Sequence, residues 1–378
     1  MNHEAYQAET RILHQRVDNE KVYPVITPLY QNSAFSADSP YFYTRKNNPN
    51  CEELEQVVAD MEGAKYAISA TTGMTTISLI LSLLRPKDHV VLNALIYGCS
   101  YKLFQRIVDQ RDLSLTILDL TKPDQIEKIP NDVKMVFFET PTNPFLKSVD
   151  ISSVTQKTKS INPSALVIVD NTWATPLHQT PLKHGADVSI YSLTKFFSGH
   201  SDVMGGMITT NRRDLSEFLR TQRFYTGGIL DPHSAWLIRR SMYTFMPRMR
   251  EHERMIKIMS EFLDGLPQVK KIYLPKIDGN QLTGYGCILF FELREDLVEH
   301  YPYFAKALRL FDTGTGMACV TSTVAQPYTG SHASLSSEEK EKMGLGRNLV
   351  RLCFGMESFK DLQDDILQAF HNIHLKTS

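Results

Sequence analysis

The sequence predicts an α/β protein with a large, mainly parallel-sheet domain and a smaller α+β domain at its C-terminal end. Between residues 51 and 235, short apolar runs alternate with stretches of helical periodicity, which is typical of parallel strands buried on both faces. Polar residues stand where several of these runs end. Near residue 235 the pattern changes to a long helical stretch followed by alternating strands, which indicates a second domain. The predicted divisions are therefore 1–50, 51–235 and 236–378.

Residues 1–50 are expected to form an N-terminal arm. Four prolines at positions 24, 28, 40 and 49 would break any long helix, so the arm should be extended with one short helix near its start. The next stretch, 52–62, carries apolar residues at helical spacing and predicts an amphipathic helix.

The large sheet is predicted from short apolar runs. Helices are expected between them near 75–84 and 101–108. The strand runs are 66–68, 89–92, 115–118, 135–138, 166–169 and 188–191. Because ligands bind beyond the carboxyl ends of parallel strands, Glu139, Asp170 and the residues from Ser192 onward are candidates for chemistry.

The smaller domain is predicted to contain a long helix from Ser234 to about Phe262, interrupted by Pro247. Strands are expected around 287–293 and 349–354. A closing helix should span about 359–373.

Charge and composition exclude several classes of protein. Lys plus Arg number 41 and Asp plus Glu 42, for a net charge of −1, which argues against a broad basic surface for nucleic acid or anionic lipid. The longest apolar stretch, 77–84, is far shorter than the roughly 18 residues of a membrane span, and no secretory signal is expected. The five cysteines (51, 99, 287, 319 and 353) form no C-x-x-C pair, so neither a disulfide framework nor a metal site is expected, and the cytoplasm is the expected compartment.

Among the residues at the strand ends, Lys195 is the first candidate for a catalytic role. The aromatic residues that follow it should reduce its solvation, which lowers the pKa of the amine and makes it available as a nucleophile. Ser192 and Thr194 offer hydroxyls of the kind that hold a phosphate. A second phosphate contact is suggested at 69–74, where a small-residue turn with a glycine precedes a helix and exposes backbone N–H groups.

Asp170 ends a strand that is expected to be buried on both faces. A buried carboxylate needs a cation or several hydrogen-bond donors. It could cap the turn that follows, or it could pair with a protonated ring nitrogen, as enzymes dependent on pyridoxal 5'-phosphate (PLP) require.

The chain resembles, nearly end to end, the fold-type I PLP-dependent enzymes of cysteine and methionine metabolism. These are cystathionine γ-synthase, the cystathionine β- and γ-lyases, and methionine γ-lyase. The resemblance is carried by Tyr43-x-Arg45 with Asn48-Pro49, Gly73-Met74, Tyr97-Gly98-Cys99, Glu139-Thr140-Pro141-Thr142-Asn143-Pro144, Val169-Asp170-Asn171-Thr172 and Ser192-x-Thr194-Lys195-x-x-x-Gly199-His200-Ser201-Asp202.

The resemblance implies three catalytic residues. Lys195 would bind the cofactor covalently and later transfer protons. Asp170 would keep the pyridine nitrogen protonated. Tyr97 would stack on the ring and donate a proton to the leaving group.

The resemblance also implies the binding residues. Tyr43 and Arg45 would reach the cofactor phosphate from a neighbouring subunit of a homotetramer, and Arg351 would fork the α-carboxylate of an amino-acid substrate. The other implied cofactor contacts are Gly73, Met74, Asn143, Thr172, Ser192 and Thr194. The other implied substrate contacts are Tyr43, Thr315, Gly316 and Thr321.

The substrate side departs from the family pattern. Gly316 stands where the family has serine and Thr321 where it has glutamate, although Thr315 could supply a hydroxyl. These changes are either neutral drift or the sign of a smaller or less polar substrate than cystathionine. A cysteine at position 99 resembles the methionine γ-lyase version of this loop, whereas a tryptophan at position 173 resembles the β-lyase version of that segment.

The activity expected from the resemblance is γ-elimination on an amino acid with a leaving group at Cγ, which releases a 2-oxo acid and ammonia. The alternatives are γ-replacement, β-elimination, and a related elimination on a non-standard amino acid. A binding protein without catalytic activity is a fourth possibility, although the cofactor motifs are complete.

Overall fold

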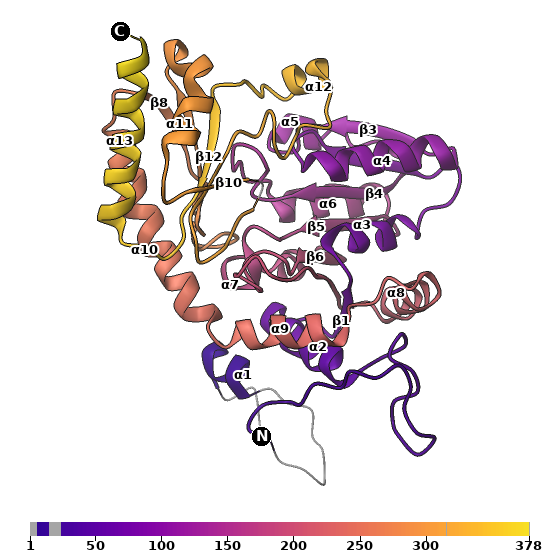
Figure 1. The fold of residues 1–378 in the computed structure, drawn as a ribbon. Helices are drawn as coiled ribbons and strands as arrows, with labels where there is room; N and C mark the ends of the chain where they lie inside the picture. The colour runs from indigo at the N-terminus through magenta and orange to yellow at the C-terminus, as the bar shows by residue number, and fades with distance from the viewer. Residues whose placement is uncertain (1–5, 15–23, 315, 378) are drawn as a thin grey trace.

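The computed structural model describes residues 6–14, 24–314 and 316–377. Figure 1 shows a large sheet wrapped by helices and a smaller sheet beside it, flanked by the C-terminal helix α13 (Phe359–Thr377). In the described part of the chain, no helix combines the length and apolar character needed to cross a membrane.

The large sheet has seven strands in the order β1-β7-β6-β5-β4-β2-β3. Their pairings are parallel from β3 through β6, while β7 is antiparallel to both of its neighbours. The strands are β1 (Tyr66–Ala70), β2 (His89–Asn93), β3 (Ser114–Leu118), β4 (Val133–Glu139), β5 (Leu166–Asp170), β6 (Val188–Ser192) and β7 (Gly206–Thr210). The sequence pattern did not reveal β7, because its Gly-Met-Ile-Thr-Thr sequence has only two large apolar side chains in a row.

Both faces of this sheet are covered, because successive strand residues point to opposite faces. Met135 and Phe137 pack into one apolar cluster, and Val136 and Phe138 into another. The first cluster includes residues of α3 (Gly73–Leu81), α4 (Gly98–Arg111) and α8 (Arg213–Thr226). On the other face lie α2 (Pro49–Glu62) and α6 (Ile151–Ile161). The predicted α/β fold with a mainly parallel sheet is confirmed.

The smaller sheet has five strands in the order β10-β11-β12-β9-β8. They are β8 (Val269–Tyr273), β9 (Ile288–Leu293), β10 (Asp312–Thr313), β11 (Thr323–Ala325) and β12 (Leu349–Cys353). Around them lie η3 (Glu295–His300), α11 (Tyr301–Ala307) and α13, whereas α12 (Ser337–Lys342) contacts α4 through the ion pair of Glu339 with Lys102 (Figure 1). The remaining short helices of the described residues are α1 (Ala8–His14), α5 (Pro123–Ile126), α7 (Thr175–His178) and η2 (Pro181–His184).

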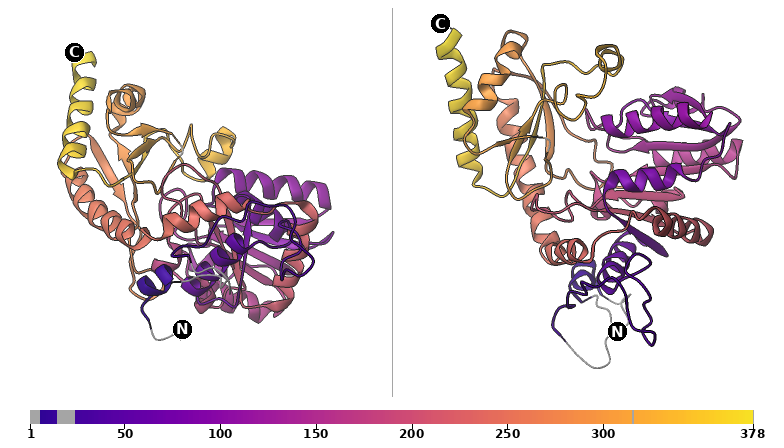
Figure 2. Two further views of the ribbon diagram at one scale, coloured as in Figure 1. Left: turned by 60° about the horizontal axis from the view of Figure 1, so that its bottom comes forward. Right: turned by 45° about the vertical axis from the view of Figure 1, so that its right-hand side comes forward.

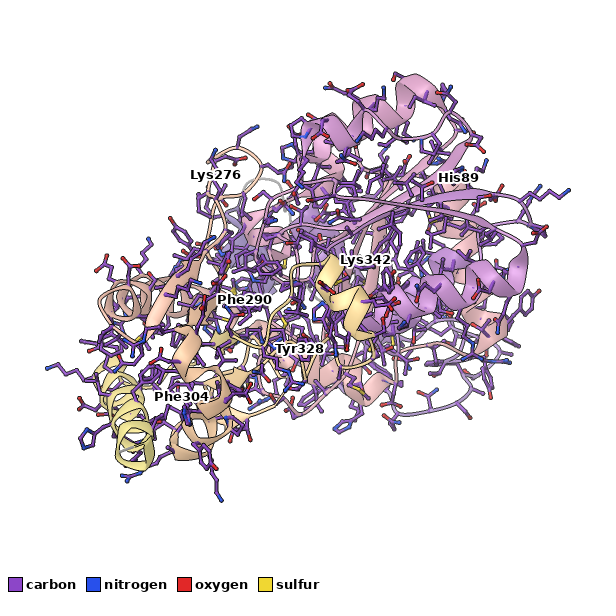
Figure 3. The ribbon with its side chains drawn as sticks, turned by 90° about the horizontal axis from the view of Figure 1, so that it is seen from above. His89, Lys276, Phe290, Phe304, Tyr328 and Lys342 are labelled. Carbon is purple, nitrogen blue, oxygen red and sulfur yellow. The ribbon has the colours of Figure 1, made fainter. Side chains whose placement is uncertain are left out.

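The two faces of β9 serve different neighbours. Leu289 and Phe291 belong to the cluster shared with α13, whereas Ile288 and Phe290 belong to the cluster of the large domain. Figure 3 shows Phe290 near the middle of the molecule, while Phe304 lies out beside the C-terminal helix. This sheet therefore presents one face to the large domain and its other face to its own helices.

The long helix expected from Ser234 is two helices, α9 (Pro232–Met242) and α10 (Phe245–Asp264). The break falls before Pro247, which lies in the first turn of α10. The expected interruption at Pro247 is therefore wrong in position. The first N–H groups of a helix lack intrahelical partners, so proline costs little there. From this break α10 runs to the side of the small sheet where α13 lies (Figure 2).

Helix α2 begins at Pro49, three residues before the expected start. The side chain of Asn48 accepts a hydrogen bond from the N–H of Asn50 and caps the helix, and proline suits its first position. The described arm, residues 24–48, is extended, with a β-bridge between Ala34 and Tyr43. The division into an arm and two domains at residues 50 and 235 stays a prediction.

A buried carboxylate joins α2, β1 and α8. Glu55 accepts hydrogen bonds from the N–H and the hydroxyl of Ser69, both at 2.8 Å, and from Arg223 at 2.7 Å. Its second oxygen lies 2.9 Å from Arg220. Burial alone would raise the pKa of Glu55, but the two arginines and Ser69 outweigh it and lower the pKa to about 2.

We predict that Glu55→Gln lowers the free energy of unfolding at pH 7 by about 3 kcal/mol. The folded pKa lies below the ordinary value of 4.5, so this contribution is present above pH 4.5 and is lost as the pH falls towards 2. Urea unfolding at several pH values should therefore give a steeper acid loss for the wild type than for the variant. The exposed pair of Glu217 and Arg213 supplies the control, since Glu217→Gln should cost less than about 1 kcal/mol. Equal effects of the two substitutions would contradict this account.

Candidate active site

A cavity of about 250 Å³ lies at the carboxyl ends of β4, β5 and β6, between them and the small sheet. The position agrees with the rule for parallel sheets. The residues proposed from the sequence that line it are Gly73, Met74, Tyr97, Asn143, Asp170, Thr172, Ser192, Thr194, Lys195 and Arg351. The fold thus brings together residues that are up to 278 positions apart in the chain.

One end of the cavity is formed by the N-terminus of α3 and the end of β6. Thr72 caps the helix by accepting a hydrogen bond from the N–H of Thr75 at 3.0 Å. Gly73 lies so close to Ser192 that an added Cβ would stand 2.9 Å from the serine Cβ. The absence of a side chain at Gly73 leaves helix N–H groups and hydroxyls together, which suits a phosphate.

Asp170 is the last residue of β5. Burial raises the pKa of its carboxyl, and the N–H and hydroxyl of Thr172 partly oppose that rise. The Thr172 N–H donates to Asp170 at 3.0 Å. Among the described residues, no basic side chain forms an ion pair with Asp170. A cation brought by a ligand would offset the cost of burying this charge.

Lys195 lies just beyond β6 and lines the same cavity. Burial, and then the positive charge of Arg351, lower the pKa of its amine, while Cys353 acts in the opposite direction. Phe196 and Phe197 are both buried, but their expected effect on the solvation of Lys195 stays a prediction. A lysine with a lowered pKa has more of the neutral amine that can act as a nucleophile or base.

Tyr97 precedes the first residue of α4 and turns towards the same cavity. Burial, and then its hydrogen bond and electrostatic interaction with Cys99, raise the pKa of the phenol to about 12. The phenol is therefore protonated at neutral pH and suited to donate a proton. Cys99 itself is exposed.

Arg351 extends from β12 and is 3% exposed. Its Nη2 donates to the carbonyl of Gly316 at 2.9 Å, and that carbonyl also accepts from the hydroxyl of Thr323 at 3.0 Å. Gly316 therefore contributes a carbonyl that fixes the guanidinium, and it lines an adjoining hollow rather than this cavity. Thr321 is exposed and outside the cavity lining, and Thr315 lies outside the described residues.

Tyr43 and Arg45 are not brought into the cavity of their own chain. Both are exposed. The Arg45 guanidinium lies over the rings of Tyr43 and Phe224, 5.5 and 4.6 Å from their centroids. Their predicted role from a neighbouring subunit stays a prediction.

Sequence reasoning missed much of the apolar wall of the cavity. Ile288 and Phe290 alternate along the expected strand at 287–293 and so should share one face of it. In the structure that face is the one of Arg351, which pairs with Phe290 in the register of β12 and β9. Glu139 was a candidate because it ends a strand, and Thr72, Pro141 and Trp173 lie in stretches that the sequence analysis singled out, but none of these four was given a binding role. The lining residues that the sequence did not single out are Ile77, Ser100, Leu146, Met317 and Ser331.

The polar groups of the cavity fit PLP. Three buried atoms that line it have no hydrogen-bond partner among the described residues: Asn143 Oδ1, Trp173 Nε1 and Arg351 Nε. With them stand an amine of lowered pKa, a carboxylate that lacks a cation, and a helix N-terminus. These are the groups needed for an aldehyde, a pyridinium nitrogen and a phosphate.

The sequence model of the Cys/Met metabolism PLP-dependent enzymes matches residues 9–371. A cystathionine beta-lyase of Lactococcus lactis subsp. cremoris is 32% identical, and the match covers 96% of this chain and 98% of the relative. An L-methionine gamma-lyase of Fusobacterium nucleatum subsp. polymorphum is 33% identical over 92% and 93% of the two chains. The resemblance noted in the sequence is confirmed.

Solved structures agree with these relatives. Cystathionine gamma synthase from Xanthomonas oryzae pv. oryzae, in complex with cystathionine, superposes with a TM-score of 0.92 and is 31% identical. The match covers 98% of this chain and 99% of that one. The chain is therefore similar throughout its length to enzymes named for three different reactions.

We predict that Gly73→Ala lowers the affinity of the apoenzyme for PLP at least tenfold (about 1.4 kcal/mol), because the new methyl group would meet Ser192. Titration of the apoenzyme with PLP, followed by absorbance, measures this affinity. Gly314→Ala is the control, since no atom lies within 4 Å of its added Cβ. Unchanged affinity in Gly73→Ala would contradict the placement of the phosphate.

Proposed function

Because this chain belongs to the family of Cys/Met metabolism PLP-dependent enzymes, we propose that it eliminates a substituent from Cγ of an amino acid and releases a 2-oxo acid and ammonia. The cofactor of the family is PLP. The convergence of Lys195, Asp170 and Arg351 on one cavity is the observation that supports this proposal most.

PLP, when bound, withdraws electrons from the substrate and so acidifies the bond between its α-carbon and hydrogen. Asp170 would hold a positive charge on the ring nitrogen, and Ser192, Thr194 and the N-terminus of α3 would hold the phosphate. Lys195 would bind the aldehyde carbon and, once displaced by substrate, accept protons through Nζ, a role that its lowered pKa supports.

Arg351 would bind and orient the substrate carboxylate. Its guanidinium is held by the Gly316 carbonyl, while Nε is buried without a partner in the described chain. A carboxylate could take both Nε and a terminal nitrogen in the fork geometry that arginine favours.

Tyr97 would donate its phenolic proton to the departing group. Its raised pKa keeps that proton in place at neutral pH, and its position beside the cavity supports the role. Transfer of the proton to the leaving atom removes the need to expel an anion.

The apolar wall of the cavity favours a substrate with an uncharged side chain, as in methionine. Ile288, Phe290 and Met317 stand on the side of the small sheet, and Leu146 and Trp173 on the side of the large domain. γ-Replacement and β-elimination remain the alternative reactions, because relatives carry the names of a gamma synthase and a beta-lyase. The products distinguish the three reactions.

We predict that the PLP-loaded enzyme converts methionine to 2-oxobutanoate and ammonia without an added thiol. The measurement is chromatographic identification of the keto acid after incubation with methionine, cystathionine and an O-acylated homoserine. Lys195→Ala should lower the rate at least about 10³-fold, whereas the exposed Lys147, replaced by alanine, should leave it unchanged. Pyruvate as the main keto acid would favour β-elimination, and product formation that depends on an added thiol would favour replacement.

We also propose that the enzyme is a homo-oligomer, a tetramer with active sites shared across a dimer interface. The arm and its surroundings carry exposed apolar side chains, among them Val25 at 79%, Phe42 at 70% and Tyr225 at 73%, and burial of such side chains is what a subunit interface provides. A cytoplasmic location is proposed with it and is supported by five free cysteines.

Sharing of the site predicts complementation between two inactive variants. Lys195→Ala and Arg45→Ala should each be inactive alone, but subunit exchange should restore about one quarter of the wild-type activity, because half of the dimers are mixed and each mixed dimer has one intact site. Arg347→Ala, which changes an exposed arginine outside the cavity, replaces Arg45→Ala in the control mixture. Mass spectrometry of tagged subunits verifies that exchange has occurred. If activity then fails to recover, Arg45 and Lys195 belong to the site of one chain.

A further inference from the structure

Glu139 carries a half-buried carboxyl group of the cavity that the proposed mechanism does not use. It is the last residue of β4 and lines the cavity. In the register of the sheet it pairs with Asp170 at the end of β5. Paired residues of parallel strands point to the same face, so the two carboxyl groups are neighbours at the point where the cofactor ring would lie.

The contacts of Glu139 lead to Tyr97. Its Oε1 accepts a hydrogen bond from the Tyr97 N–H, and the N–H of Asn143 also hydrogen-bonds to this carboxyl. Helix α4 has no side-chain cap from Tyr97 itself. The carboxyl of Glu139 therefore supplies the acceptor that the start of α4 lacks.

We propose that Glu139 is a positioning residue: its carboxyl holds the backbone of Tyr97 and of Asn143, and thereby sets the Tyr97 phenol against the cofactor ring. One side chain would then connect three groups of the site, because Asp170 stands next to it. The inference rests on the proposed function only in that PLP must bind.

The protonation state of Glu139 follows from its surroundings. Burial first, and then the negative charge of Asp170, raise its pKa well above the usual value. The groups that face it are Asp170 from β5, the N–H of Tyr97 from the start of α4, and the N–H of Asn143. A protonated Glu139 still accepts through Oε1, and it leaves the only negative charge of the pair on Asp170, where the ring nitrogen requires it.

The neutral form makes glutamine a faithful substitute. Glu139→Gln keeps an acceptor oxygen and adds no charge, so the visible circular dichroism of bound PLP and its dependence on pH should match those of the wild type. Glu139→Ala removes the acceptor. It should change that dichroism without substrate and lower kcat about 10- to 100-fold, with KM changed less than threefold.

A double-mutant cycle that combines Glu139→Ala with Tyr97→Phe tests whether Glu139 acts through Tyr97. If it does, Glu139→Ala should cost much less in the Tyr97→Phe background than in the wild type. Glu292→Ala is the matched control, because Glu292 accepts a hydrogen bond from Tyr273 in the small sheet, away from the cavity lining. It should leave the dichroism and kcat within twofold of the wild type.

Three results would overturn the inference. The first is a Glu139→Ala enzyme that is folded by far-ultraviolet circular dichroism and keeps both its visible dichroism and its kcat. The second is full additivity with Tyr97→Phe. The third is a Glu139→Gln enzyme as impaired as Glu139→Ala, which would mean that the charge matters. Since the dichroism of bound PLP is read without substrate, failure of the proposed reaction would leave this test intact.

Discussion

The carboxylate of Asp170 is half-buried at the end of β5, and no cation of the described chain is paired to it; much of the structure around the cavity can be understood from that constraint. The burial cost is tolerable when a ligand brings a positive charge. Glu139 stands beside Asp170 and would add a second negative charge unless it kept its proton. A cationic ring held by Asp170 and a neutral acid at Glu139 would satisfy both conditions.

The small sheet completes the site from the opposite side. Alternation along β9 and β12 sends Leu289 and Leu352 towards the helices of that domain, and Phe290 and Arg351 towards the large domain. A single strand register therefore sets both the stability of the C-terminal domain and the position of the guanidinium that would bind substrate. A slip of one residue would exchange these two faces and remove Arg351 from the cavity.

Much of the fold was predictable because parallel strands buried on both faces leave uninterrupted apolar runs, and the cofactor-side residues could be proposed because polar groups stand at the ends of those runs. Other features were hidden for physical reasons. β7 has only two large apolar side chains in a row, and Pro247 predicts a helix break although a first helical turn accepts proline. Contacts that join distant segments, such as the Glu139 bond to Tyr97 and the Arg351 bond to Gly316, leave no periodic signal. The proposed part of Tyr43 and Arg45 depends on a second chain and cannot be read from one.

The most direct test of the central claim is to fix the bond between protein and cofactor chemically. The PLP-loaded enzyme, reduced with borohydride and digested, should yield one peptide that carries the reduced cofactor, and fragmentation in the mass spectrometer should locate the added mass on Lys195. Attachment to another lysine, or no attachment in an enzyme that has bound PLP, would contradict the account.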